Sequence, residues 1–187
     1  MLRKMLTLSF WLMTLTPISH ATNDNPQVRI DTNMGSFTIE LYQEAAPVTV
    51  ANFLRYVDEG FYNKTIFHRI IKRFVVQGGG YDTNKVKKET HPPIINESHN
   101  RLYNERFTVA MARTEDPNSA SSQFYINMRM NSALDARMGR VGYTVFGSVI
   151  DGREVVSDMS YVATHTFAGM EDFPIEPVVL LKAERIK

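Results

Sequence analysis

Residues 67–79 read FHRIIKRFVVQGG, and this stretch decides both the fold class and the candidate chemistry of the chain. Strand alternation would place Arg69 between the apolar residues Phe67 and Ile71 on one face. An arginine is costly to bury without a partner, so we expect Arg69 to line a groove. The residues leave open a surface arginine whose stem covers apolar area.

Short alternating or apolar runs of this kind recur along the chain and predict a mainly β protein. Met34-Gly35 would join the first two runs as a tight hairpin. The predicted strands are Gln27–Thr32, Ser36–Tyr42, Thr65–Ile71, Phe74–Gln77, Phe107–Ala112, Gln123–Asn127, Tyr143–Val149 and Val178–Ile186.

Two stretches have helical spacing instead. In Pro47–Glu59 the apolar residues recur at helical intervals, a proline opens the segment, and Gly60 suits the position after its end. In Asp151–Ser160 we expect Asp151 to be the N-cap, with Glu154 completing a capping box. Together these elements predict a closed eight-stranded antiparallel β-barrel capped by two α-helices, because closure removes exposed sheet edges.

The N-terminus has the pattern of an export signal. Arg3 and Lys4 precede an uncharged run of about 14 residues, which is too short for a bilayer that needs roughly 20. Small residues at Ser19 and Ala21 then suit a signal peptidase. We therefore predict a cleaved signal peptide at 1–21, a single domain at 22–187, and a protein that lies in the periplasm or is secreted. A membrane anchor or a first helix of the fold are the alternatives.

Charge and residue types exclude several function classes. Without Arg3 and Lys4 the chain has 19 basic and 20 acidic residues, so neither nucleic acid nor, after signal cleavage, a membrane is an expected partner. The chain has no cysteine, and its histidines lack paired metal spacing. Gly78-Gly79-Gly80 lacks the Lys-Ser/Thr of a phosphate loop, and no serine stands in a G-x-S-x-G motif. We expect no metal and no cofactor.

The stretch at 67–79 matches the cyclophilin signature FHRIIxxFxxQGG, and the chain resembles that family. Met111-Ala112-Arg113 followed by SSQFYIN at 121–127 resembles the second signature of the family, and YTVFG at 143–147 resembles a third. The resemblance extends from about Gln27 to the C-terminus and is closest to periplasmic bacterial members. It implies a peptidyl-prolyl cis-trans isomerase that helps exported polypeptides to fold.

The resemblance also implies a substrate groove on an outer face of the barrel. Arg69 would be the catalytic residue, and Gln77 and Gln123 would orient the substrate backbone. The edge at Ala112 and Arg113 would hold the residue that precedes proline in an extended conformation. Apolar side chains would form the pocket for the proline ring: Phe74, Val75, Tyr125 and Leu134.

The chain departs from the family pattern near this groove. Ala133 stands where many members have a tryptophan, and Tyr143, also a candidate substrate contact, stands where many have a histidine. Arg113 replaces a frequent asparagine, and the segment 136–142 is longer than in many members. We therefore expect weak cyclosporin binding. The partners that we expect are proline-containing polypeptides, bound by a monomer.

Two other functions remain possible at this level. A non-catalytic chaperone could bind proline peptides in the same groove, although the presence of Arg69 favours an enzyme. An unrelated small β-barrel could carry an apolar ligand, which would require a hollow interior.

Overall fold

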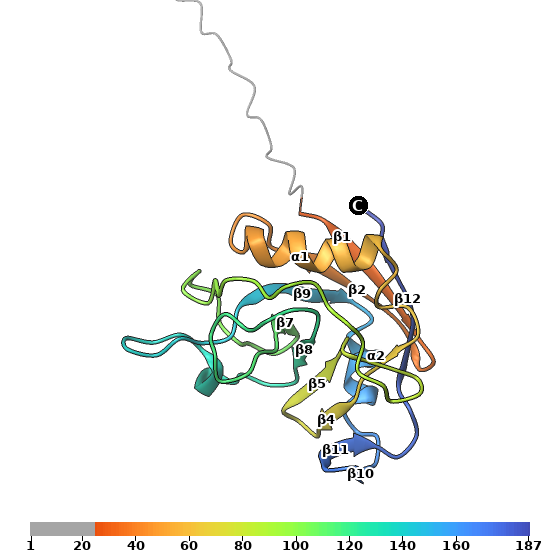
Figure 1. Cartoon of the computed structure of the whole chain (residues 1–187). Helices are drawn as coiled ribbons and strands as arrows, with labels where there is room; N and C mark the ends of the chain where they lie inside the picture. The colour runs from red at the N-terminus through yellow and green to blue at the C-terminus, as the bar shows by residue number, and fades with distance from the viewer. Residues whose placement is uncertain (1–24) are drawn as a thin grey trace, which may run out of the picture.

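The computed structural model describes residues 25–187, so the predicted signal peptide lies outside the described residues. The described chain is mainly β with two α-helices, as predicted (Figure 1). The helices are α1 (Pro47–Asp58) and α2 (Arg153–Met159), with a 3-10 turn η1 at Ser132–Leu134. The strands are β1 (Gln27–Thr32), β2 (Gly35–Leu41), β3 (Thr65–Ile66), β4 (Arg69–Ile71), β5 (Val75–Gly78), β6 (Tyr81–Asp82), β7 (Thr108–Met111), β8 (Phe124–Asn127), β9 (Val145–Asp151), β10 (Thr164–Phe167), β11 (Met170–Pro174) and β12 (Val179–Arg185).

Helix α1 follows its sequence pattern closely. Proline occupies its first turn, and Val50, Phe53 and Val57 are buried along one side. The helix ends at Asp58, and Gly60 adopts φ +66°, a left-handed conformation that glycine accepts without strain.

Helix α2 begins differently from the prediction. Its N-cap is Gly152 in the left-handed region, with no side-chain capping bond. Asp151 is instead the last residue of β9, where it pairs with Thr38, so the predicted Asp151 capping box is wrong. A Cβ atom at Gly152 would lie 2.3 Å from the carbonyl oxygen of Ser36. The close approach of β2 therefore requires glycine at this helix start.

Ten strands form one curled sheet in the order β4-β5-β8-β7-β9-β2-β1-β12-β3-β6. The prediction of a closed eight-stranded barrel is thus replaced by a half-barrel of ten strands. The reason lies in Thr65–Ile71, predicted as one continuous strand. It divides at Phe67-His68 into β3, which pairs with β12, and β4, which pairs with β5. The two parts lie at different places in the strand order, with β4 at one edge of the sheet and β3 next to the other edge.

The inner face of the sheet packs around aromatic side chains. Phe53 of α1 contacts Phe124 of β8 with ring centroids 5.5 Å apart and Phe146 of β9 at 5.2 Å. These three rings are 0% exposed. Side chains therefore fill the space that a carrier of an apolar ligand would need to leave hollow.

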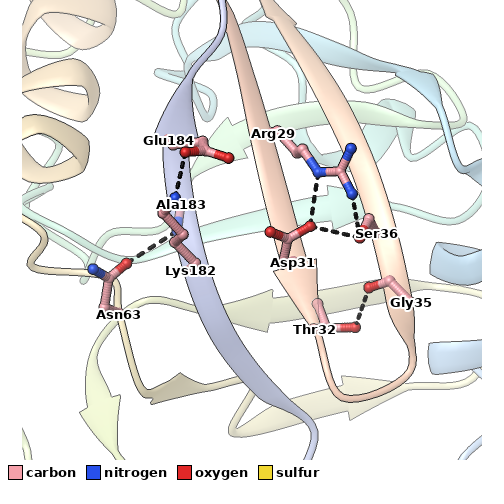
Figure 2. Close-up of polar contacts among 9 residues, drawn as sticks. All are labelled: Arg29, Asp31, Thr32, Gly35, Ser36, Asn63, Lys182, Ala183 and Glu184. Carbon is pink, nitrogen blue, oxygen red and sulfur yellow. Dashed lines mark hydrogen bonds and ion pairs between the residues drawn. The ribbon is translucent and has the colours of Figure 1, made fainter.

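Polar contacts hold the sheet at β1, β2 and β12, away from the predicted groove (Figure 2). The Arg29 Nε atom donates to Asp31 at 2.8 Å, and the Ser36 hydroxyl donates to the same carboxylate at 2.5 Å. These hydrogen bonds, from Ser36 and then Arg29, lower the pKa of Asp31. Across β12, the backbone N–H of Ala183 donates to Asn63 at 3.0 Å. The contacts join β1 to β2, and β12 to the turn that precedes β3.

Candidate active site

Five neighbouring strands bring one row of residues onto the outer face of the sheet. Arg69 of β4 pairs with Gln77 of β5, Gln77 with Tyr125 of β8, Tyr125 with Ala110 of β7, and Ala110 with Val145 of β9. Directly paired residues in an antiparallel ladder point to the same face. The row next to it, which includes Ile70 and Val76, faces the core. Strand register therefore aligns Arg69 with a floor of apolar and amide side chains.

A second apolar cluster lies on this outer face, separate from the main core. Four buried residues form its floor: Val75, Ala110, Tyr125 and Val145. Partly exposed residues pack against them: Phe74, Leu102, Ala112, Leu134 and Tyr143. The four residues predicted for the proline pocket thus lie in one cluster, although they come from segments far apart in the sequence. Sequence reasoning missed Leu102, Ala110 and Val145.

Hydrogen bonds beneath the pocket fix the orientation of Tyr125. Its hydroxyl donates to Asn104 Oδ1 at 2.9 Å, and the backbone N–H of Asn104 donates to Asp135 at 2.7 Å. The Asn104 side chain donates to the same carboxylate at 2.9 Å. Burial raises the pKa of Tyr125 well above its ordinary value, so the hydroxyl stays protonated and can donate. Asn104 and Asp135 carried no sequence signal, since only the fold brings them to this ring.

Two glutamines form a polar rim beside the pocket. Gln77 Nε2 donates to Gln123 Oε1 at 3.0 Å, and both side chains are half-buried. The backbone N–H of Ala112 donates to the Gln123 carbonyl at 3.0 Å. A depression of about 180 Å³ adjoins them, with Gly80 and Arg113 also in its lining. The amides and this depression suit an extended backbone with a side chain pointing into the sheet.

Arg113 has a structural use for its guanidinium group. Nη2 donates to the Val141 carbonyl at 3.0 Å, and Nε donates to the Gly142 carbonyl at 3.2 Å. The same group lies 4.4 Å from the centre of the Tyr143 ring. The Arg113 side chain therefore holds the segment 136–142, which is longer than in many cyclophilins, against the rim of the pocket. The backbone of Arg113 is the part that remains available to a peptide.

Arg69 lies at the opposite end of the row with its side chain 42% exposed. Its Nε atom is 3.9 Å from Asp172 Oδ2. Asp172 belongs to the hairpin of β10 and β11, which lies beside β4 (Figure 1). It adopts φ +58°, an unusual conformation for a residue other than glycine. Sequence reasoning predicted neither this hairpin nor a carboxylate next to Arg69.

His68 points away from Arg69 and is buried, with its ring 4.6 Å from that of Tyr81. Burial lowers its pKa to about 4. Its Nδ1 atom has no hydrogen-bond partner. His68 is therefore neutral at physiological pH and is a poor candidate for acid–base chemistry there.

Comparison with known proteins identifies this arrangement. Residues 27–185 match the family model described as cyclophilin type peptidyl-prolyl cis-trans isomerase/CLD. The chain belongs to the cyclophilin family. It is therefore a peptidyl-prolyl cis-trans isomerase, and the groove described above is the candidate site of that activity.

Curated peptidyl-prolyl cis-trans isomerases support this identification over most or all of the chain. A peptidyl-prolyl cis-trans isomerase of Acinetobacter baylyi is 46% identical over 160 residues, covering 86% of this chain and 85% of the relative. The peptidyl-prolyl cis-trans isomerase A of Dickeya dadantii is 41% identical over 189 residues, with complete coverage of both chains.

Solved structures agree with the fold. A cyclophilin of Cryptosporidium parvum has a TM-score of 0.73 at 26% identity, covering 87% of this chain and 98% of that one. A structure of this cyclophilin in the presence of the dipeptide Ala-Pro has a TM-score of 0.72 at 27% identity, with coverage of 86% and 99%.

Proposed function

We propose that this cyclophilin accelerates X-Pro bond rotation in exported polypeptides, with Arg69 as the catalytic residue. The observation that carries the assignment is the alignment of Arg69 with Gln77 and with Tyr125 in the apolar pocket. Neighbouring strands support all three positions, so the groove is largely preformed. A preformed groove loses little free energy to reorganisation when a substrate binds.

The chemistry requires a surface that favours the twisted amide over both planar isomers. Rotation is opposed by about 18–20 kcal/mol of amide resonance. Loss of resonance leaves a lone pair on the prolyl nitrogen, and a guanidinium beside that nitrogen stabilises it. Arg69 remains charged throughout the physiological pH range and presents a rigid set of donors. No bond to the substrate forms or breaks in this scheme.

The other residues of the groove would bind different parts of the substrate. The proline ring would occupy the cluster around Phe74, Tyr125 and Leu134. Gln77 and Gln123 would bind the flanking backbone, and the Ala112–Arg113 edge would hold the residue before proline. With the ring and the following chain fixed, the carbonyl that precedes proline is the part free to rotate.

Export is a separate part of the proposal and is supported by residues 1–21 alone. The described helices are too short or too polar to cross a membrane. We propose that signal cleavage releases a monomeric mature chain near Thr22 into the periplasm. N-terminal sequencing of the protein from a periplasmic extract tests this point, and recovery of the chain with Met1 in the membrane fraction contradicts it.

The isomerase assignment is tested with an Ala-Pro peptide in a coupled or exchange assay. Wild-type protein should turn the peptide over, and Arg69→Ala should lose most of that activity. Peptide binding without turnover by the wild type would favour the non-catalytic chaperone instead.

A further inference from the structure

A basic cleft of about 870 Å³ opens beside the proline pocket, between the β4–β5 turn, the segment after β8 and the end of α2. Four cations line it: Lys72, Arg73, Arg106 and Arg129. Its other polar lining consists of uncharged hydroxyl groups such as those of Ser157 and Tyr161, and no carboxylate is among the lining residues.

These cations lack an ion-pair partner among the described residues. None of the four forms an ion pair with a carboxylate in residues 25–187. Three of them lie over aromatic rings, and Lys72 Nζ is 4.9 Å from the centre of the Tyr161 ring. The guanidinium carbon of Arg106 is 4.5 Å from the centre of the Phe107 ring, and that of Arg129 is 5.6 Å from the centre of the Phe74 ring. A ring beneath the cation does not neutralise its charge, so an anion that enters the cleft can pair with these groups.

Phe74 connects this cleft with the proposed substrate site, because it lines both the cleft and the apolar pocket. Gln77 and Ala112 lie toward the other end of the pocket, in the depression beside the glutamines. If the residue before proline lies at Ala112, the chain that follows proline passes Phe74 and enters the cleft. This step rests on the proposed orientation of the substrate.

We propose that the basic cleft binds acidic side chains that follow proline in the substrate, so that the enzyme prefers acidic segments after the isomerised bond. Aspartate and glutamate side chains have the charge and reach that the four cations require. A nucleic acid or an anionic membrane is less suitable, because the chain without Arg3 and Lys4 has 19 basic and 20 acidic residues and so has no net positive charge to attract a polyanion.

The test compares peptides of one length that differ only after proline: Ala-Ala-Pro-Ala-Glu-Glu-Ala, its Gln-Gln analogue and its Lys-Lys analogue. Exchange NMR with the mature protein measures kcat/KM for each. An exposed ion pair is worth at most about fivefold. Two such pairs should raise kcat/KM for the Glu-Glu peptide roughly five- to tenfold over Gln-Gln at low salt. The ratio should approach one at 0.5 M salt, where screening acts within about 4 Å.

Variants locate the effect. Lys72→Gln/Arg106→Gln should abolish most of the Glu-Glu preference while keeping turnover of the Gln-Gln peptide. Arg55→Gln/Lys182→Gln removes the same charge from residues outside the cleft and should keep the preference. A Glu-Glu pair placed before proline would lie near Lys87 and Lys88 instead, so Lys72→Gln/Arg106→Gln should not change kcat/KM for that peptide.

Equal kcat/KM for the three peptides, or a preference that survives Lys72→Gln/Arg106→Gln, would overturn the proposal. Binding of anionic vesicles or oligonucleotides through these cations, without a Glu-Glu preference, would overturn it as well. Turnover of the Gln-Gln peptide distinguishes this failure from a failure of the isomerase assignment itself.

Discussion

Replacing Arg69 with alanine should separate catalysis from stability. The side chain is 42% exposed, and its ion contact with Asp172, at 3.9 Å, is long and solvated. An exposed pair of this kind contributes about 0–1 kcal/mol to stability. For a domain of this size such a change shifts Tm by at most about 2–4 °C. We therefore expect Arg69→Ala to fold with nearly the wild-type Tm.

Activity should respond far more strongly. A preorganised donor aimed at charge that develops in a transition state is worth about 2.7–4 kcal/mol, or two to three orders of magnitude in rate. Arg69→Ala should lose this amount in kcat/KM. Arg69→Lys should recover only part of it, because an ammonium group keeps the charge but lacks the planar fork.

The assay measures Ala-Pro peptide turnover by a coupled or NMR exchange method, together with thermal unfolding of each variant. Arg55→Ala is the matched control, because it removes an exposed arginine from α1, outside the groove. Turnover of Arg69→Ala near the wild-type rate, in a folded protein, would refute the assigned role. An equal loss in Arg55→Ala would show that net charge is responsible.

Other perturbations have equally definite outcomes. Gly80→Ala would place a Cβ atom 2.6 Å from Gln123 Cγ, so it should displace the Gln123 amide and lower kcat/KM severalfold. An unchanged kcat/KM would contradict a role for Gln123 in substrate binding. His68 has a pKa of about 4 and Tyr125 has a pKa well above its ordinary value, so neither titrates between pH 6 and 8. The rate of isomerisation should therefore be nearly independent of pH in this range. A steep bell-shaped pH profile would indicate acid–base catalysis instead. As pH falls from about 6.5 to 4, the unfolded chain gains a proton on His68 that the folded chain rejects. The free energy of unfolding should therefore fall by up to about 3 kcal/mol, and His68→Gln should remove this component in urea titrations. Ala133→Trp should strengthen cyclosporin inhibition by almost two orders of magnitude, because about 100 Å² of added apolar contact is worth roughly 2.5 kcal/mol. Unchanged inhibition would show that contact between residue 133 and the ligand at the rim of the groove is unimportant.

Local patterns predicted those elements whose structure depends on nearby residues. The boundaries of β1 agree with the sequence prediction, and α1 ends within one residue of it, because alternation, an initial proline and Gly60 act over a few residues. Patterns failed where a tertiary contact overrides local preference. Asp151 is a good N-cap residue, yet pairing with Thr38 keeps it in β9, and the approach of Ser36 requires glycine next to it.

The candidate site shows the same division. The motif at 67–79 and the SQFYIN segment carry Arg69, Gln77, Gln123 and Tyr125, so the groove and its apolar pocket could be predicted from the resemblance of these segments to the cyclophilin family. The contacts that orient these groups come from distant segments whose composition has no catalytic signature. Asn104 under Tyr125 and Asp172 beside Arg69 depend on loop and hairpin placement, and the basic cleft needs the β4–β5 turn, Arg106 and α2 together. Residue types and short spacings show which functional groups a segment contains. The distances between groups from different segments depend on strand register and on the path of the loops, which only the folded chain determines.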